Sequence, residues 1–242
     1  MQILTAAIIK GGTGKTTTAA ALAQAAAADG KKTLAVDLDP QGNLSFDLAA
    51  DPQLGGSFDL LNGEPAAKLV QHSPTGPDVI PADLRNFSIT SSRGSARRLR
   101  TALQPVLASY DIIIIDTPPT PGELQYNALQ AASQLIIPLQ ADIHSLQGLY
   151  LIAEAADSFR ESNPALRVSG IIITRHNERS SLARQMRDNI ISEAAGLNIP
   201  YLGAIREAVA IREAQALQAN LYEYAPKSKP ALDYLDIYRK LI

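Results

Sequence analysis

The 242-residue sequence contains no cysteine, and none of its apolar stretches approaches the roughly 18 residues that a membrane-spanning helix requires. The absence of cysteine excludes disulfide bonds, thiolate metal sites and cysteine nucleophiles. A formal net charge of −2 gives no overall field that would by itself attract nucleic acid. The N-terminus has the pattern of a strand and not of a signal peptide, so we expect a cytosolic protein.

Arginine is unevenly distributed, because an acid-rich first third of the chain is followed by a basic cluster without acids. The cluster consists of Arg85, Arg93, Arg97, Arg98 and Arg100. A solvated helix face explains most runs of this kind, and a weak basic patch for a polyanion is the alternative.

A phosphate-binding loop is the most specific pattern that is present. Residues 10–17 read Lys-Gly-Gly-Thr-Gly-Lys-Thr-Thr and follow the apolar run of residues 3–9. Glycines in such a loop adopt positive φ and let backbone N–H groups approach phosphate oxygens. The Ala-rich stretch that follows predicts a helix whose N-terminus would face the phosphates. A glycine-rich turn with chance lysines is the alternative, but the strand–loop–helix context favours the binding loop.

Each polar side chain of this loop has an expected role. Lys15 is placed to reach the β- and γ-phosphates, and Thr16 to supply a hydroxyl to Mg²⁺. Lys10 stands at the loop entrance, where it could point away from the phosphates of its own chain. The expected nucleotide-binding residues of the loop are Lys10, Gly11, Gly12, Thr13, Gly14, Lys15, Thr16 and Thr17.

Acidic residues follow two further apolar runs. Asp116 comes directly after four isoleucines, which is the Walker B arrangement, and could hold Mg²⁺ opposite Thr16. Asp37 and Asp39 stand two residues apart, so an extended backbone would turn both to the same side. One of them could orient an attacking water and the other tune the metal shell. Alternatively, one of the pair is a helix-capping residue before Pro40.

Alternating apolar runs and amphipathic stretches predict an α/β fold with a doubly wound, mostly parallel sheet and helices on both faces, as one domain over residues 1–242. We expect strands at 2–9, 33–38, 78–81, 111–116, 134–139, 169–174 and 201–204. We expect helices at 15–29, 94–109, 122–132, 145–161, 179–195 and 229–241. Residues 51–77 are expected to be irregular surface. Ligands of such sheets bind at the carboxyl ends of the strands.

Taken together, the motifs resemble the ParA/Soj branch of the deviant Walker A ATPases, relatives of MinD within the P-loop NTPases. They span nearly the whole chain in the order of that family. The matching segments are Lys10 to Thr18, Asp37 to Asn43, Ile114 to Pro119, Pro138 to Asp142 with Leu146 to Gly148, and Tyr224 to Lys229.

The resemblance implies an ATP- and Mg²⁺-dependent ATPase that closes into a homodimer around its nucleotides. Lys10 would contact the phosphates bound by the other subunit, and Asp39 would orient the attacking water. The implied catalytic residues are Lys10, Lys15 and Asp39, and the implied metal site comprises Thr16, Asp39 and Asp116. Asp142 matches a position that reaches nucleotide across the dimer. The implied adenine-side wall includes Thr174, Arg175 and Arg206.

The resemblance also implies non-specific DNA binding by the ATP dimer and hydrolysis stimulated by a ParB-like centromere-binding protein. Such a protein is cytoplasmic and nucleoid-associated, and it partitions plasmid or chromosomal DNA. Since Met1 already opens the first strand, we expect no N-terminal helix-turn-helix and no operator-specific repression.

The family pattern of residues 205–214 is altered, because Arg206 replaces a proline and Ala210 an arginine. DNA contact would then fall to Arg175, Arg212, Lys227 and Lys229, with Arg206 and the basic cluster at 93–100 as alternatives, since phosphate contacts require charge and not base geometry.

Other functions of related ATPases remain as alternatives. A MinD-like ATPase cycling on membranes is one, but residues 231–242 carry few basic residues for a membrane-surface helix, so we expect this helix to dock on the domain and no membrane partner. A positioning ATPase for cargo other than DNA is another. A metal-cluster carrier is disfavoured by the absence of cysteine.

Overall fold

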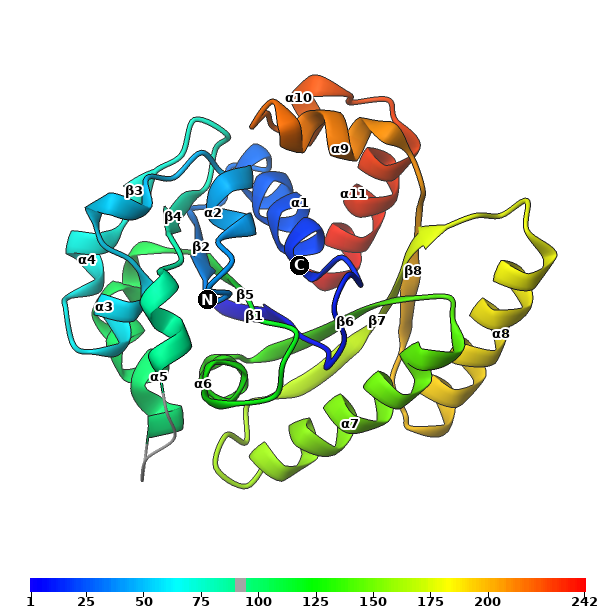
Figure 1. Ribbon diagram of the computed structural model, residues 1–242, viewed down its shortest axis with the longest axis horizontal. Helices are drawn as coiled ribbons and strands as arrows, with labels where there is room; N and C mark the ends of the chain where they lie inside the picture. Colours follow the sequence, from blue (N-terminus) through cyan, green and yellow to red (C-terminus); the bar gives the residue numbers. More distant parts are fainter. Residues whose placement is uncertain (90–94) are drawn as a thin grey trace.

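The computed structural model describes residues 1–89 and 95–242, and it has one twisted eight-stranded sheet between two layers of helices (Figure 1). The strand order is β3-β4-β2-β5-β1-β6-β7-β8, in which the β3–β4 pair is antiparallel and the other pairs are parallel. This confirms the predicted doubly wound fold. The strands are β1 Gln2–Ala6, β2 Thr33–Asp37, β3 Gln71–His72, β4 Asp78–Ile80, β5 Ile112–Asp116, β6 Gln134–Gln140, β7 Arg167–His176 and β8 Tyr201–Arg206.

Both faces of the sheet are buried, which explains why its strands are continuous apolar runs. In β5, Ile113 and Ile115 point into one core cluster and Ile112 and Ile114 into the other. Side chains alternate between the faces of a strand, so a strand covered on both sides needs apolar residues at every position.

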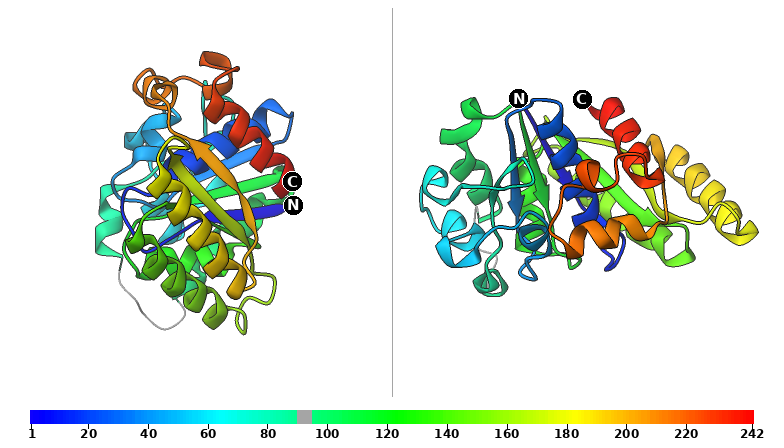
Figure 2. Two further views of the ribbon diagram at one scale, coloured as in Figure 1. Left: turned by 90° about the vertical axis from the view of Figure 1, so that its right-hand side faces the viewer. Right: turned by 90° about the horizontal axis from the view of Figure 1, so that it is seen from above.

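The helices divide between the two faces of the sheet (Figure 2). One layer contains α1 Lys15–Ala28, α2 Asn43–Asp47, α9 Val209–Ala216, α10 Leu221–Tyr224 and α11 Lys229–Leu241. The other contains α3 Ser57–Leu61, α4 Ala66–Leu69, α5 Arg98–Leu103, α6 Glu123–Ala131, α7 Ile143–Phe159 and α8 Ser181–Gly196. Four 3₁₀ turns are η1 Pro52–Leu54, η2 Leu84–Ser88, η3 Ser95–Arg97 and η4 Gln104–Ser109.

Helix α1 is buried along most of its length because its side chains are small. Its central residues, from Thr18 to Ala26, are all buried, and they lie between the sheet and α11. Alanine at these positions lets the neighbouring elements approach closely while keeping a high helix propensity. The loop between β1 and α1 is thereby fixed at the carboxyl edge of the sheet.

Two expectations need correction. Residues 51–77 are not irregular throughout, since they form η1, α3, α4 and β3. Residues 95–109 are helical but not one α-helix, because α5 is flanked by η3 and η4, and Pro105 lies in the first turn of η4. Proline cannot donate the backbone hydrogen bond that would continue α5. Arg93 and Gly94, which belong to the predicted basic cluster and helix, lie outside the described residues.

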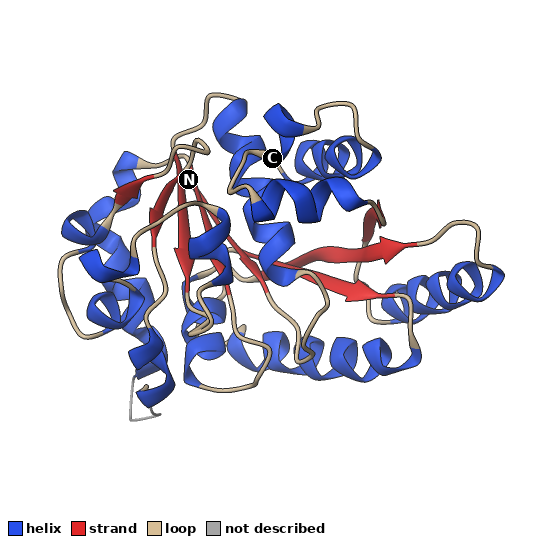
Figure 3. Cartoon of the chain, turned by 45° about the horizontal axis from the view of Figure 1, so that its top comes forward, coloured by secondary structure: helices blue, strands red, loops and turns tan. Residues whose placement is uncertain are grey.

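The last helix docks on the domain, as expected from its composition. Helix α11 contacts α1 and β8, and the C-terminus lies among the helices on one side of the sheet (Figure 3). The buried side chains of α11 are Pro230, Ala231, Tyr234, Ile237, Tyr238 and Leu241. Within residues 1–89 and 95–242, no helix combines the length and the apolar character needed to cross a membrane.

Candidate active site

The phosphate loop has the backbone conformation that its glycines were expected to supply. Gly12 and Gly14 have φ angles of 73° and 87°. A Cβ atom on Gly14 would also lie 3.2 Å from Cγ2 of Thr174. The loop therefore requires glycine at position 14 for two independent reasons, its left-handed backbone and its close neighbour.

Side chains from two neighbouring strands hold the loop in place. Thr174 Oγ1 at the end of β7 donates to Thr13 O at 2.7 Å, and Gln140 Nε2 at the end of β6 donates to Gly12 O at 2.7 Å. Thr174 was predicted only as part of an adenine-side wall, and its buttressing contact was missed. Gln140 was not predicted at all, because nothing in the local sequence indicates that β6 ends beside the loop.

The loop helix and β5 form a site that fits Mg²⁺. Thr16 Oγ1 donates to Asp116 Oδ2 at 2.6 Å, and Asp116 Oδ1 is buried without a hydrogen-bond partner among the described residues. The described residues contain no group of three or more candidate acidic, histidine or cysteine ligands. This donor set suits Mg²⁺, which is commonly held by one or two protein oxygens together with phosphates and water.

Burial controls the electrostatics around this pair. Burial raises the pKa of Asp116 well above its ordinary value, and the nearby charge of Asp37 adds to the effect. Burial also lowers the pKa of Lys15, against the opposing attraction of Asp116 and Asp39. Buried acids held this close to one another favour the binding of a further positive ion.

Asp37 and Asp39 do not share one role. Asp37 is fully buried and accepts hydrogen bonds from Ser45 N at 2.9 Å, Ser45 Oγ at 2.7 Å and Asp39 N at 3.0 Å. Burial raises the pKa of Asp37 to about 7. Asp39 accepts from Gln41 N at 3.0 Å and lines a cavity of about 460 Å³ together with the phosphate loop. Asp37 thus anchors the segment that carries Asp39.

Lys10 points away from this cavity, as its place at the loop entrance suggested. Its Nζ lies 2.6 Å from both carboxylate oxygens of Asp142 and 3.1 Å from Ser145 Oγ. Asp142 also caps α7 by accepting from Ser145 N. Burial by itself would raise the pKa of Asp142, but the hydrogen bond and charge of Lys10 and the hydrogen bonds from Ser145 together lower the pKa below its ordinary value.

A second, smaller cavity of about 130 Å³ adjoins the first and shares Gly14, Thr17, Arg175 and Gln215 with it. Arg206 lines this cavity, but its guanidinium is bound to Asp233 of α11 at 2.5 Å, and its backbone N–H donates to the same carboxylate. A proline at position 206 could not make the backbone bond. The sequence analysis identified neither Asp233 nor Gln215.

The predicted DNA-contact residues are all exposed. Arg175 is the penultimate residue of β7 and has a φ of 49°. Arg212 lies on α9, and Lys227 and Lys229 lie around the start of α11.

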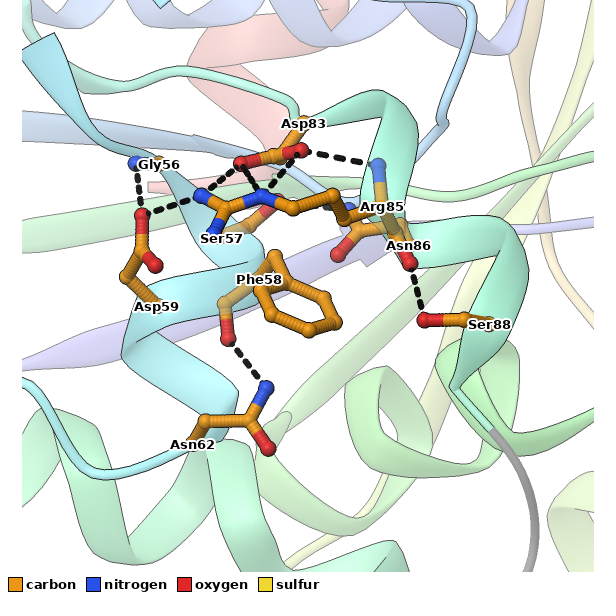
Figure 4. Close-up of polar contacts among 9 residues, drawn as sticks. All are labelled: Gly56, Ser57, Phe58, Asp59, Asn62, Asp83, Arg85, Asn86 and Ser88. Atoms are coloured by element: carbon orange, nitrogen blue, oxygen red, sulfur yellow. Dashed lines mark hydrogen bonds and ion pairs between the residues drawn. The ribbon is translucent and has the colours of Figure 1, made fainter.

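Arg85, by contrast, belongs to a local ion-pair cluster and not to an open basic patch (Figure 4). Its guanidinium pairs with Asp83 at 2.5 Å and Asp59 at 2.8 Å, and it lies 4.5 Å from the ring centre of Phe58. This cluster joins η2 to α3.

Comparisons with known proteins agree with the geometry of this site. A family model described as an AAA domain matches residues 1–168. The chromosome-partitioning ATPase Soj of Thermus thermophilus is 36% identical, over 93% of this chain and 89% of its own length. The chromosome partitioning protein ParA of Myxococcus xanthus is 34% identical, over 96% and 85%.

A solved structure extends the similarity to three dimensions. It is the Mycobacterium smegmatis protein named cobyrinic acid a,c-diamide synthase, with a bound ATP analogue and magnesium. It is 28% identical and superposes with a TM-score of 0.84, covering 100% of this chain and 94% of its own. The family model matches more than half of the chain, and both relatives exceed 30% identity over more than nine tenths of it, so the chain belongs to the ParA/MinD-type family of partition and positioning ATPases.

Proposed function

We propose that this protein is a Mg²⁺-dependent ATP hydrolase that dimerises on ATP, binds DNA non-specifically and partitions plasmid or chromosomal DNA. One observation carries the proposal: Asp116 Oδ1 is buried without a partner beside Thr16, and Asp39 faces the adjoining cavity. The relatives named for chromosome partitioning, and the solved structure with an ATP analogue and magnesium, support the same assignment.

The residues of the site divide the work of phosphoryl transfer. Lys15 would neutralise the β- and γ-phosphates, while Thr16 and Asp116 would hold Mg²⁺, which supplies charge stabilisation when it is bound. Asp39 would orient the attacking water, with its backbone held by Asp37. The glycines of the loop leave the backbone N–H groups of residues 11–16 open toward the phosphates.

Dimerisation gives Lys10 its role in this proposal. A cation supplied by a second subunit stabilises the charge that develops on the transferred phosphoryl group, as an arginine finger does. For that role Lys10 must leave Asp142, which it binds within the single chain. The same rearrangement would release Asp142 toward the partner, consistent with its proposed reach across the dimer.

DNA would be held by the exposed residues Arg175, Arg212, Lys227 and Lys229. Such contacts read the phosphate backbone and not the bases. Since ATP causes two chains to pair in this proposal, it doubles the number of these cations on one particle. DNA binding would therefore depend on ATP. A ParB-like centromere-binding protein would then stimulate hydrolysis and release the cytoplasmic, nucleoid-bound dimer.

Sedimentation with plasmid DNA tests the proposal. We expect co-sedimentation with MgATP but not with MgADP. The logarithm of the DNA-binding constant should fall linearly with the logarithm of the salt concentration, with a slope of about −0.9 for each phosphate contact. Asp39→Ala should bind DNA and hydrolyse no ATP, because it retains the nucleotide but lacks the group that orients water. Binding with ATP to anionic liposomes and not to DNA would replace this function by a membrane-cycling one.

A further inference from the structure

A buried acid on α2 has its polar contact with α9, an element far away in the sequence. Asp47 is 7% exposed, and its Oδ2 accepts a hydrogen bond of 2.7 Å from Gln215 Nε2. Burial raises the pKa of Asp47 to about 6, and the bond from Gln215 acts against this rise. Helix α2 begins directly after the loop that carries Asp39, so the contact joins that loop to α9.

Gln215 also reaches the phosphate-loop helix. Its Nε2 lies 3.4 Å from Thr17 Oγ1, and a primary amide carries two protons, one for each partner. The side chain lines both the 460 Å³ cavity that contains the phosphate loop and the smaller cavity beside it. One amide therefore lies between α1, α2 and the space that we assign to the nucleotide.

The turn that follows α9 has a further bond to α2, which provides a comparison close to the first contact. Gln218 Nε2 donates to Phe46 O at 2.9 Å, but Gln218 lines neither cavity of the nucleotide site. The three helices lie together on one face of the sheet (Figure 1). Helix α9 also carries Ile211 and Arg212, which line the smaller cavity.

We propose that Gln215 is a positioning residue that makes the place of α9 depend on whether the nucleotide cavity is filled. A phosphate that accepts a hydrogen bond from the Thr17 hydroxyl fixes the direction of the hydroxyl lone pairs and strengthens the bond from Gln215. Because the same amide holds Asp47, α1, α2 and α9 become ordered together. Because Arg212 lies on α9, this coupling connects nucleotide binding to one of the residues that we propose to contact DNA. The inference therefore rests on the proposed function.

The effect expected from two hydrogen bonds is modest and measurable. The net contribution of one hydrogen bond changes an equilibrium constant by about three- to tenfold. Coupling between two sites commonly changes a binding affinity by about five- to 150-fold. Loss of Gln215 should therefore weaken the response of α9 severalfold while leaving most nucleotide affinity to the phosphate loop.

A single tryptophan can report on α9, because the chain has none of its own. Leu217 caps α9 and is 64% exposed, so Leu217→Trp places the reporter without disturbing the core. In this background we expect MgATP to change the tryptophan emission. Adding Gln215→Met should reduce that change at least about threefold and alter MgATP affinity by less than about tenfold.

Matched variants separate coupling from packing. Gln218→Met removes the bond between the turn after α9 and α2, and it should leave the response intact. Asp47→Asn keeps an acceptor for Gln215 and should respond like the parent, whereas Asp47→Ala should lose the response without any change in α9. An unchanged response in Gln215→Met and Asp47→Ala, or an equal loss in Gln218→Met, contradicts the proposal.

The same variants distinguish this inference from the proposed function. If the parent does not bind MgATP, the assignment of the cavity fails. If it binds MgATP and the tryptophan emission does not change, only the proposed coupling between the nucleotide cavity and α9 is contradicted. If the coupling holds, Gln215→Met should also reduce the ratio of DNA affinities with MgATP and without nucleotide by about fivefold.

Discussion

Asp37 and Asp39 lie two residues apart on one extended segment, yet their surroundings give them different chemistry. Asp37 is enclosed and accepts three hydrogen bonds, two of them from Ser45. The carboxylate of Asp39 accepts a hydrogen bond from the backbone of Gln41 and faces the cavity. The sequence predicted an acidic pair at the end of β2, but it could not separate the two roles. The difference depends on Ser45 of α2, which the fold brings back to Asp37.

Asp47 allows a prediction about stability, since it is a buried carboxylate whose pKa is raised to about 6. An acid whose folded pKa exceeds its unfolded value of about 3.9 binds its proton more tightly in the folded state, so stability is lost as pH rises from about 4 to 6. Asp47→Asn removes this loss. We expect the variant to exceed the wild type by about 1–3 kcal/mol in free energy of unfolding at pH 7.5.

Urea unfolding at pH 7.5 and pH 4.5 measures this difference, and comparison with the wild type cancels the titration of the other acids. The advantage of Asp47→Asn should shrink toward pH 4.5, where the carboxyl group of the wild type is largely protonated. Asp51→Asn is a suitable control, because Asp51 is exposed and should show no such pH-dependent gain. A gain of equal size at both pH values would contradict a raised pKa at Asp47.

At the scale of elements, length decided what the sequence could predict. The isoleucine run of β5 and the Ala-rich α1 were predicted within a few residues, since each repeats one pattern over its whole length. Helices α2, α3, α4 and α10 have only four or five residues, fewer than two turns, and no periodicity develops over such lengths. Their place is set by tertiary contacts.

The same distinction applies to the functional residues. The phosphate loop, Asp39 and Asp116 could be predicted because each belongs to a contiguous motif. Gln140, Asp47 and Gln215 could not, since each makes its contact through a fold that brings distant segments together, over 168 residues between Asp47 and Gln215.

Helix α11 gives a prediction at this scale, because docking buries one face of the helix and leaves the other exposed to solvent. Ile237 is 1% exposed in the core, while Leu232 on the same helix is 48% exposed. Ile237→Ala should lower the free energy of unfolding by about 2–5 kcal/mol, because it leaves a cavity in a packed core. Leu232→Ala should change it by less than about 0.5 kcal/mol. Chemical denaturation measures both, and similar small losses would indicate that α11 is not docked in solution.

At the scale of the whole molecule, the catalytic residues that we propose do not all face one cavity. The phosphate loop, Thr16 and Asp39 line the cavity, and Asp116 accepts the hydrogen bond of Thr16, but the cation at the loop entrance faces outward to α7. The Lys10–Asp142 pair is partly exposed, with side chains that are 23% and 35% accessible, so solvent and salt weaken it. A pair of this kind can open at small cost when a second chain offers Lys10 a phosphate.

Mixing two inactive variants tests whether the site belongs to two chains. If Lys10 acts on the nucleotide of the partner, a dimer of Lys10→Ala with Asp39→Ala contains one intact site, formed by Asp39 of the first chain and Lys10 of the second. An equal mixture should then recover about a quarter of the wild-type ATPase rate, because half of the dimers are mixed and each has one working site. Lys10→Ala alone should be slower than the wild type by about 10³-fold, the lower end of the range for a cation supplied in trans, and Asp39→Ala alone should hydrolyse no ATP. Mixing Asp39→Ala with Lys15→Ala is the control, since Lys15 and Asp39 line one cavity of the same chain, and the mixed dimer keeps no complete site. If Lys10→Ala with Asp39→Ala recovers no more activity than this control, Lys10 acts within its own chain.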